Sequence, residues 1–319
     1  MSFFHSLAFG ITALVIVGGS WCICGLVMGS APKHGVSSAV VQRISAVVSC
    51  VVSVIVLLAT GAWRCDASTS AVLWTCGCYF AASVVNASML QLMSMAMQRG
   101  PNGIIWCIIQ SALLFPFLVG VLFFHVTAGW LQALGLAMLL AALVTFGMSK
   151  DNTVRSDTSN DGAISWKALA FLAFLITGLQ QNLSTLPSYF EEARQVSSVL
   201  RTLCGALGTI LTTIIWSLVK GESSIFLCDK KTFCNPHFWG YIVAMNGFGL
   251  FASYFLLYPG IDILARNDLG GMGYPLMVGS CIVSFTLASI FLLRETFRWK
   301  QALAVALCLA GLIALCWKG

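Results

Sequence analysis

Val36-Ser37-Ser38 returns 160 positions later as Val196-Ser197-Ser198, in a chain that is almost entirely apolar. Three further matches follow in the same order: Phe80-Ala81-Ala82-Ser83 with Leu250-Phe251-Ala252-Ser253, Gly100 and Gly103 with Gly270 and Gly273, and Trp130-x-Gln132-Ala133-Leu134 with Trp299-x-Gln301-Ala302-Leu303. The spacing grows to about 170 because a polar loop at 220–237 has no equal in the first half. Short matches that keep their order indicate an internal repeat.

The apolar segments of the chain divide evenly between the two halves. They cover residues 6–28, 36–60, 71–97, 101–124 and 129–148, then 168–189, 195–219, 238–258, 271–293 and 299–317. A helix needs about 20 apolar residues to cross a bilayer, and most of these segments are long enough. An odd number of crossings in each repeat turns the second copy upside down. We therefore expect an all-α integral membrane protein, with ten transmembrane helices arranged as two inverted five-helix repeats around a central cavity.

This pattern divides the chain into a first repeat at 1–149, a polar linker at 150–167 and a second repeat at 168–319. Charged residues make up 9% of the sequence, against about 25% in soluble domains, so the bilayer is the expected surrounding. The net charge of +6 is scattered through loops, which does not indicate nucleic-acid binding. Phosphate-loop, zinc-protease and nucleophile-elbow motifs are absent, and the four histidines lie in different loops. We expect no enzyme activity, cofactor or metal.

Polar side chains inside apolar segments give the functional hypothesis, because a polar group in hydrocarbon is costly and needs a reason. The candidate substrate-binding residues are Gln42, Arg43, Asn86, Gln110, Ser111, Gln180, Gln181, Asn182, Arg201, Asn246 and Tyr274. Amides both donate and accept hydrogen bonds, which suits hydroxyl-rich or zwitterionic solutes. An arginine facing the cavity would bind a carboxylate or phosphate. The alternatives are hydrogen bonds between helices for the amides and snorkelling to the interface for the arginines.

Acidic residues are nearly absent from the expected spans. The first 150 residues contain only Asp66, in a loop, and the others near the membrane stand at segment ends: Glu191, Glu192, Asp262 and Glu295. A proton-coupled exporter of lipophilic cations would normally hold a carboxylate at mid-membrane. This distribution favours neutral or anionic solutes.

The last segment resembles a known family. Leu293-Arg294-Glu295 is followed by Trp299-Lys300-Gln301 and later by Gly311-Leu312-Ile313, which looks like the closing motif of EamA-type repeats. The chain resembles the drug/metabolite transporter superfamily over nearly its whole length, although His125 stands where the first repeat would have Glu. The stretch Gly100–Ser111 is similar in character to the sugar-uptake members of this superfamily. The resemblance implies a central cavity, rocking-type alternating access and cytoplasmic termini.

Counting Lys and Arg over the loops instead favours termini on the outside, so the two indications of orientation disagree. Cys228 and Cys234 share one polar loop and would pair only if that loop faces an oxidising compartment. We expect a transporter of a small polar metabolite (a sugar, an amino acid or a related compound), a monomer or homodimer in a bacterial inner membrane. Two alternatives stay open: a drug or amino-acid exporter of the same superfamily, and a non-transporting receptor or assembly factor.

Overall fold

The computed structural model describes residues 6–97, 99–100, 102–126, 128–149, 165–219, 230–291 and 299–317. Most of the expected linker, Cys228, and the part of the EamA-like motif before Trp299 lie outside these residues. The described residues make up the helical body of the protein.

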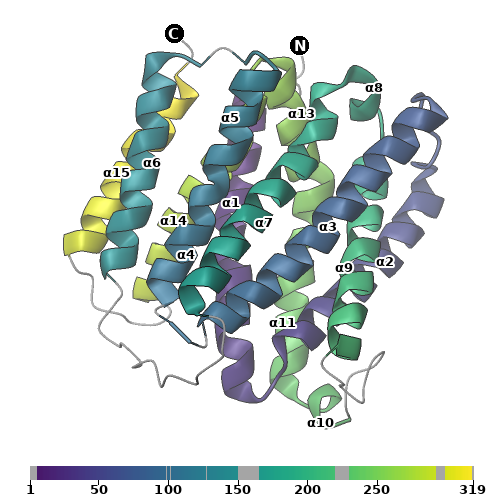
Figure 1. The fold of residues 1–319 in the computed structure, drawn as a ribbon. Helices are drawn as coiled ribbons and strands as arrows, with labels where there is room; N and C mark the ends of the chain where they lie inside the picture. Colours follow the sequence, from purple (N-terminus) through teal and green to yellow (C-terminus); the bar gives the residue numbers. More distant parts are fainter. Residues whose placement is uncertain are drawn as a thin grey trace.

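The first half consists of long helices joined by short connections (Figure 1). Its elements are α1 (Leu7–Ser30), a 3₁₀ turn η2 (Ala31–His34), α2 (Ser38–Thr60), α3 (Thr69–Met97), α4 (Asn102–Gln110), η3 (Ser111–Leu113), α5 (Leu114–Phe123) and α6 (Trp130–Ser149). The fourth apolar segment changes to 3₁₀ geometry at η3, just before Pro116. Proline has no N–H for the carbonyl of the residue four positions earlier, so a regular helix cannot continue unchanged there.

The helices of the second half are more often interrupted. Its elements are α7 (Trp166–Thr185), η4 (Leu186–Tyr189), α8 (Glu191–Arg194), α9 (Ser198–Val219), α10 (Lys230–Phe233), α11 (Pro236–Gly247), α12 (Gly249–Phe251), η5 (Ala252–Leu257), α13 (Tyr258–Arg266), η6 (Gly270–Met272), α14 (Gly273–Phe291) and α15 (Trp299–Cys316). In Figure 1, α1 begins and α15 ends at the same end of the molecule, where α8 and α13 also lie.

One expected boundary is wrong. The segment expected to end at residue 258 continues as a helical stretch to Arg266, through a π-helical turn at η5 that directly precedes α13. Pro259 stands in the first turn of α13, directly after this π-helical turn. Asp262 consequently lies inside an apolar span, and it is only 9% exposed. The carboxylate thus lies within the span, four residues before its end at Arg266.

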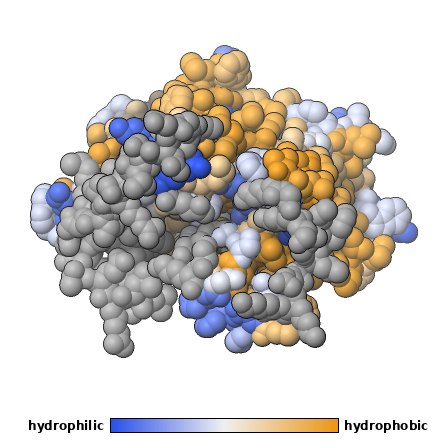
Figure 2. Space-filling model, turned by 60° about the horizontal axis from the view of Figure 1, so that its bottom comes forward, coloured by the Kyte–Doolittle hydropathy of each residue, from blue (hydrophilic) through white to orange (hydrophobic). Residues whose placement is uncertain are grey.

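The described chain contains seven apolar helical stretches long enough to cross a bilayer, and two shorter apolar helices within α6 and α15. Large apolar side chains cover their outward faces, such as Val51 on α2 and Leu211 on α9, which are 53% and 43% exposed. Figure 2 shows hydrophobic surface over much of the described part of the face it presents, with hydrophilic residues in smaller patches. Such a surface is solvated by lipid tails, so the protein is an integral membrane protein.

Pairs of helices distant in sequence form the interior. The main contacts join α6 to α15, α1 to α14, α2 to α9, and α3 to both α7 and α9. Small residues bring backbones together where lipid gives no hydrophobic drive. A Cβ on Gly18 would overlap the Met277 backbone of α14, and one on Gly135 would stand 2.7 Å from the carbonyl oxygen of Gly311. Every one of these main contacts joins the first half to the second.

Candidate functional site

A cavity of about 330 Å³ lies between the two halves. The first half contributes side chains from α1, α2 and α3, and the second half contributes α9 and the stretch from α11 to α13. Most of the polar groups on its wall are amides and hydroxyls: Gln42, Ser45, Ser49, Ser83, Asn86, Thr202, Thr209, Asn246, Ser253 and Tyr258. Three of the sequence-predicted residues, Gln42, Asn86 and Asn246, are thus brought together here.

The lining positions follow the spacing of the sequence matches. On α2 and α9 the wall positions stand 160 residues apart, as Gln42 with Thr202, Ser45 with Gly205, Ala46 with Ala206, and Ser49 with Thr209. On α3 and η5 the spacing is 170, as Ser83 with Ser253. Wall residues of α2 and α9 therefore recur at the same spacing as the sequence matches.

Some wall groups are already hydrogen-bonded within the protein. Ser49 Oγ donates to Asn246 Oδ1 at 2.9 Å, and Asn246 Nδ2 donates to the carbonyl of Ile242 at 3.0 Å. Ser45 differs, because its hydroxyl is buried at 7% exposure and has no hydrogen-bond partner among the described residues. A buried hydroxyl without a partner costs free energy, and a bound solute or water would remove that cost.

Arg201 lies beside the cavity and is held by the protein itself. Its guanidinium is 1% exposed, and Nη1 donates to Asp262 Oδ1 and Oδ2 at 3.1 and 2.9 Å. Nη2 donates to the carbonyl of Ala193 at 2.9 Å. The guanidinium also stands 5.7 Å from the ring centres of both Tyr79 and Tyr258. Tyr258 lines the cavity, so one aromatic side chain lies near both the cavity and this ion pair.

Arg43 lies elsewhere, at the contact between α2 and α9. Its Nη2 donates to the carbonyl of Thr213 at 3.2 Å and to the hydroxyl of Ser217, which joins α2 to α9. Arg43 does not line the cavity. The two arginines stand 158 positions apart, not 160, and two residues turn a helix face by about 200°. They therefore do not occupy equivalent positions.

The amide cluster of α7 lies away from this cavity. Gln180 Nε2 donates to the hydroxyls of Ser184 at 3.1 Å and Tyr274 at 3.3 Å, which connects α7 to α14. Gln181 is buried, and Asn182 donates back to the carbonyl of Gly178 at 2.9 Å. In the fourth segment Gln110 is half-buried at the end of α4, and Ser111 donates to the carbonyl of Ile108 at 2.6 Å.

Sequence reasoning missed the small hydroxyls of the wall. Ser45 and Ser49 follow Gln42 at the three- and seven-residue spacing that places side chains on one helix face. That polar stripe in an apolar helix was a usable signal, but single serines also occur as ordinary packing residues. Tyr258, the last residue of the expected segment, was also missed, and the Asp262 partner of Arg201 was missed because the segment was expected to end before it.

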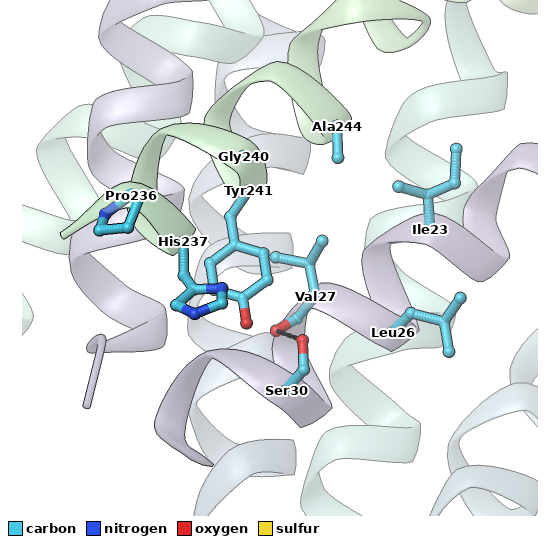
Figure 3. Close-up of a pocket in the computed structure, with 9 residues that line it drawn as sticks. All are labelled: Ile23, Leu26, Val27, Ser30, Pro236, His237, Gly240, Tyr241 and Ala244. Atoms are coloured by element: carbon cyan, nitrogen blue, oxygen red, sulfur yellow. Dashed lines mark hydrogen bonds between the residues drawn. The ribbon is translucent and has the colours of Figure 1, made fainter. Parts of the chain in front are cut away.

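A second hollow of about 470 Å³ lies at the opposite end of the molecule from α8, between α1 and the start of α11 (Figure 3). Its wall is mostly apolar, with Ser30, His237 and Tyr241 as the polar groups. The Tyr241 hydroxyl is 2.8 Å from His34 Nδ1, and the rings of His34 and His237 stack with centres 4.3 Å apart. Ser30 Oγ donates to the carbonyl of Val27 at 3.4 Å. Because its tyrosine and serine hydroxyls are already hydrogen-bonded, this hollow offers a polar solute less than the central cavity does.

No protein-family model matches this chain, and no curated protein sequence matches it. Twenty-two chains of solved structures match it in fold. One of them, described only as "Crystal structure of protein", covers 97% of this chain and 96% of its own length, with a TM-score of 0.63 and 14% sequence identity. At that identity the similarity shows a shared fold over nearly the whole chain. It does not show the function, which has to be argued from the candidate site.

Proposed function

We propose that this chain is a membrane transporter that moves a small polar metabolite by alternating access, built from two inverted five-helix repeats of the drug/metabolite transporter type. The observation on which the proposal depends is the central cavity: polar groups gather inside an apolar membrane protein, at the junction of its halves. Carriers of this architecture bind substrate at the interface of their repeats.

Three observations support the proposed inverted repeat. The wall residues of α2 and α9 pair at the same 160-residue spacing as Val36-Ser37-Ser38 and Val196-Ser197-Ser198. Gly18 in α1 and Gly178 in α7 stand at that spacing too, and each packs tightly against the fourth segment of the other half. The start of α1 and the end of α15 lie at one end of the molecule, as an even number of crossings requires (Figure 1).

Uptake of mixed metabolites into proteoliposomes tests the proposal for many substrates at once. Vesicles would be incubated with an equimolar mixture of labelled sugars, polyols, amino acids and organic acids, and their contents read by mass spectrometry. We expect at least one compound to accumulate with the wild-type protein and to be lost with Asn86→Ala. Thr60→Ala is the matched control, since Thr60 lies exposed at the end of α2 and its hydroxyl bonds only the carbonyl of Val56.

Vesicle contents that equal those of protein-free vesicles would overturn the proposal and favour a receptor or assembly factor. A drug exporter has one observation in its favour, because Asp262 is a carboxylate inside a span. Both oxygens of Asp262 are held by Arg201, so the carboxylate is not free to bind a cation. Accumulation that depends on a proton gradient, with lipophilic cations as substrates, would favour the exporter.

A further inference from the structure

The central cavity contains no charged wall residue among the residues that the structure describes. Its polar groups are primary amides, aliphatic hydroxyls and the Tyr258 phenol. Amides and hydroxyls offer both donors and acceptors without a net charge. A solute that enters such a cavity gives up its hydration shell and receives hydrogen bonds but no counter-ion.

The nearest arginines do not change this picture. Arg201 is neutralised by two hydrogen bonds to Asp262, and its other terminal nitrogen is bound to a backbone carbonyl. Arg43 is directed to the carbonyl of Thr213 and the hydroxyl of Ser217 on α9. Neither guanidinium lines the cavity. A carboxylate or ammonium group in the cavity would therefore be desolvated without a partner, which is strongly unfavourable.

The wall also has features that suit a hydroxyl-rich molecule. Ser45 Oγ is more than nine-tenths buried, lines the cavity and has no hydrogen-bond partner among the described residues. Asn86 stands on the α3 side, and Tyr258 adds an aromatic surface. A volume of about 330 Å³ is at the small end of ligand pockets, which run from about 300 to 1,000 Å³. This size suits a single ring more than a disaccharide or a lipid.

Resting on the proposed transport function, we infer that the cavity selects uncharged, hydroxyl- or amide-rich solutes of about one sugar ring and rejects carboxylates, ammonium ions and zwitterions. The inference excludes amino acids, which the amides alone would have allowed. The cause of rejection is the absence of a counter-ion on the wall, so adding a wall charge should change the selection in a defined direction.

Three probes with one ring skeleton test the inference: glucose, glucuronate and glucosamine, assayed at a pH low enough to keep the glucosamine amine protonated. We expect the labelled neutral sugar to enter wild-type proteoliposomes faster than either charged probe by about tenfold, which corresponds to about 1.4 kcal/mol of discrimination. Glucuronate or glucosamine entering as fast as glucose would overturn the inference while leaving the transport function intact. Exclusion of all three probes would also overturn it, and the metabolite mixture then shows separately whether the transport function fails.

A charge introduced on the cavity wall tests the inference further. Ser45→Asp places a carboxylate on the wall, and we expect it to raise glucosamine entry relative to glucose. Ser45→Ala is the matched control: it removes the same hydroxyl, adds no charge, and should lower the rate of glucose entry while keeping the preference for the neutral probe. An unchanged glucosamine-to-glucose ratio in folded Ser45→Asp protein would contradict the inference.

Discussion

Position 41 of α2 and position 201 of α9 stand at matching places in the two copies of the proposed repeat, each next to a cavity-lining residue. Val41 is fully buried in an apolar cluster with Val27, Val36, Phe238 and Ile242. Arg201 is equally buried, but it is paired with Asp262 and stands 5.7 Å from the ring centres of both Tyr79 and Tyr258. One side of the cavity is thus bordered by apolar packing and the other by an ion pair.

The difference indicates that positions matched by spacing in the two halves can carry side chains of different chemistry. Apolar contacts separate and re-form with little directional demand. A buried ion pair resists the loss of either partner, because the remaining charge stays in a low-dielectric surrounding. Any motion that separated α9 from α13 would have to break this pair. A motion that separated α2 from α11 would instead part the apolar side chains around Val41 and break neutral hydrogen bonds, such as the one from Ser49 to Asn246.

Arg201→Ala should give the largest loss of stability among the variants that compare the two halves. It leaves the Asp262 carboxylate buried without its partner, and we expect a loss of about 3–5 kcal/mol of stability. Val41→Ala removes two methyl groups from a packed cluster and should cost roughly 1–3 kcal/mol. Thermal unfolding of the two variants in the same detergent measures the difference. Equal losses would contradict the role assigned to the ion pair.

The double variant Arg201→Met with Asp262→Leu tests the same comparison further. It replaces the ion pair of the second half by apolar side chains, like those around Val41 in the first half. Replacing a buried ion pair by apolar residues of similar volume is often neutral or stabilising. We expect the double variant to recover most of the stability lost in Arg201→Ala. A double variant as unstable as the single one would show that the surrounding hydrogen bonds, and not the unpaired charge, determine the effect.

Gly18 and Gly178 provide a second, smaller contrast between the halves. A Cβ on Gly18 would meet the backbone of Met277, whereas a Cβ on Gly178 would meet the ring of Phe115. A side chain can rotate away and a backbone cannot, so Gly18→Ala should cost more, within the roughly 1–3 kcal/mol typical of overpacking. Thermal stability of the two alanine variants checks the order, and a greater loss for Gly178→Ala would reverse this interpretation.

The smallest expected effect concerns Ser217, which receives one hydrogen bond from Arg43. Ser217→Ala removes that acceptor while the Arg43 bond to the carbonyl of Thr213 remains. We expect a loss of about 1 kcal/mol, the usual net worth of one hydrogen bond. Surface changes away from such contacts lie within about 0.5 kcal/mol, so Thr60→Ala sets the baseline for the same unfolding assay.

The apolar helices could be predicted from the sequence, because the length of an apolar segment is a strong signal for a membrane helix. The site was predicted only in part. Gln42, Asn86 and Asn246 line the cavity, and their amides were visible as costly groups in apolar segments. Whether a polar side chain faces a cavity or a neighbouring helix depends on the rotation and crossing of helices, as Gln180 bonded to Tyr274 illustrates. The rotation of each helix about its axis cannot be read from a single sequence.

The clearest error concerned Asp262, and its physical cause is local. The segment was expected to end at residue 258, directly before Pro259. The π-helical turn η5 just before it lets the chain continue as a helical stretch to Arg266. A carboxylate expected at the membrane surface is consequently buried and ion-paired.

Four tryptophan variants test most directly whether the solute passes between the two halves. Ala46 and Ala206 line the cavity from α2 and α9, and Val51 and Leu211 stand at matching positions on the outward faces of the same helices. Uptake of the metabolite mixture would be measured for each variant beside its thermal stability, with leucine replacing tryptophan at 46 and 206 if either variant fails to fold. We expect both cavity variants to lose accumulation about tenfold or more, and both outward variants to keep it. Wild-type uptake in a folded Ala46→Trp or Ala206→Trp protein would contradict the proposed pathway.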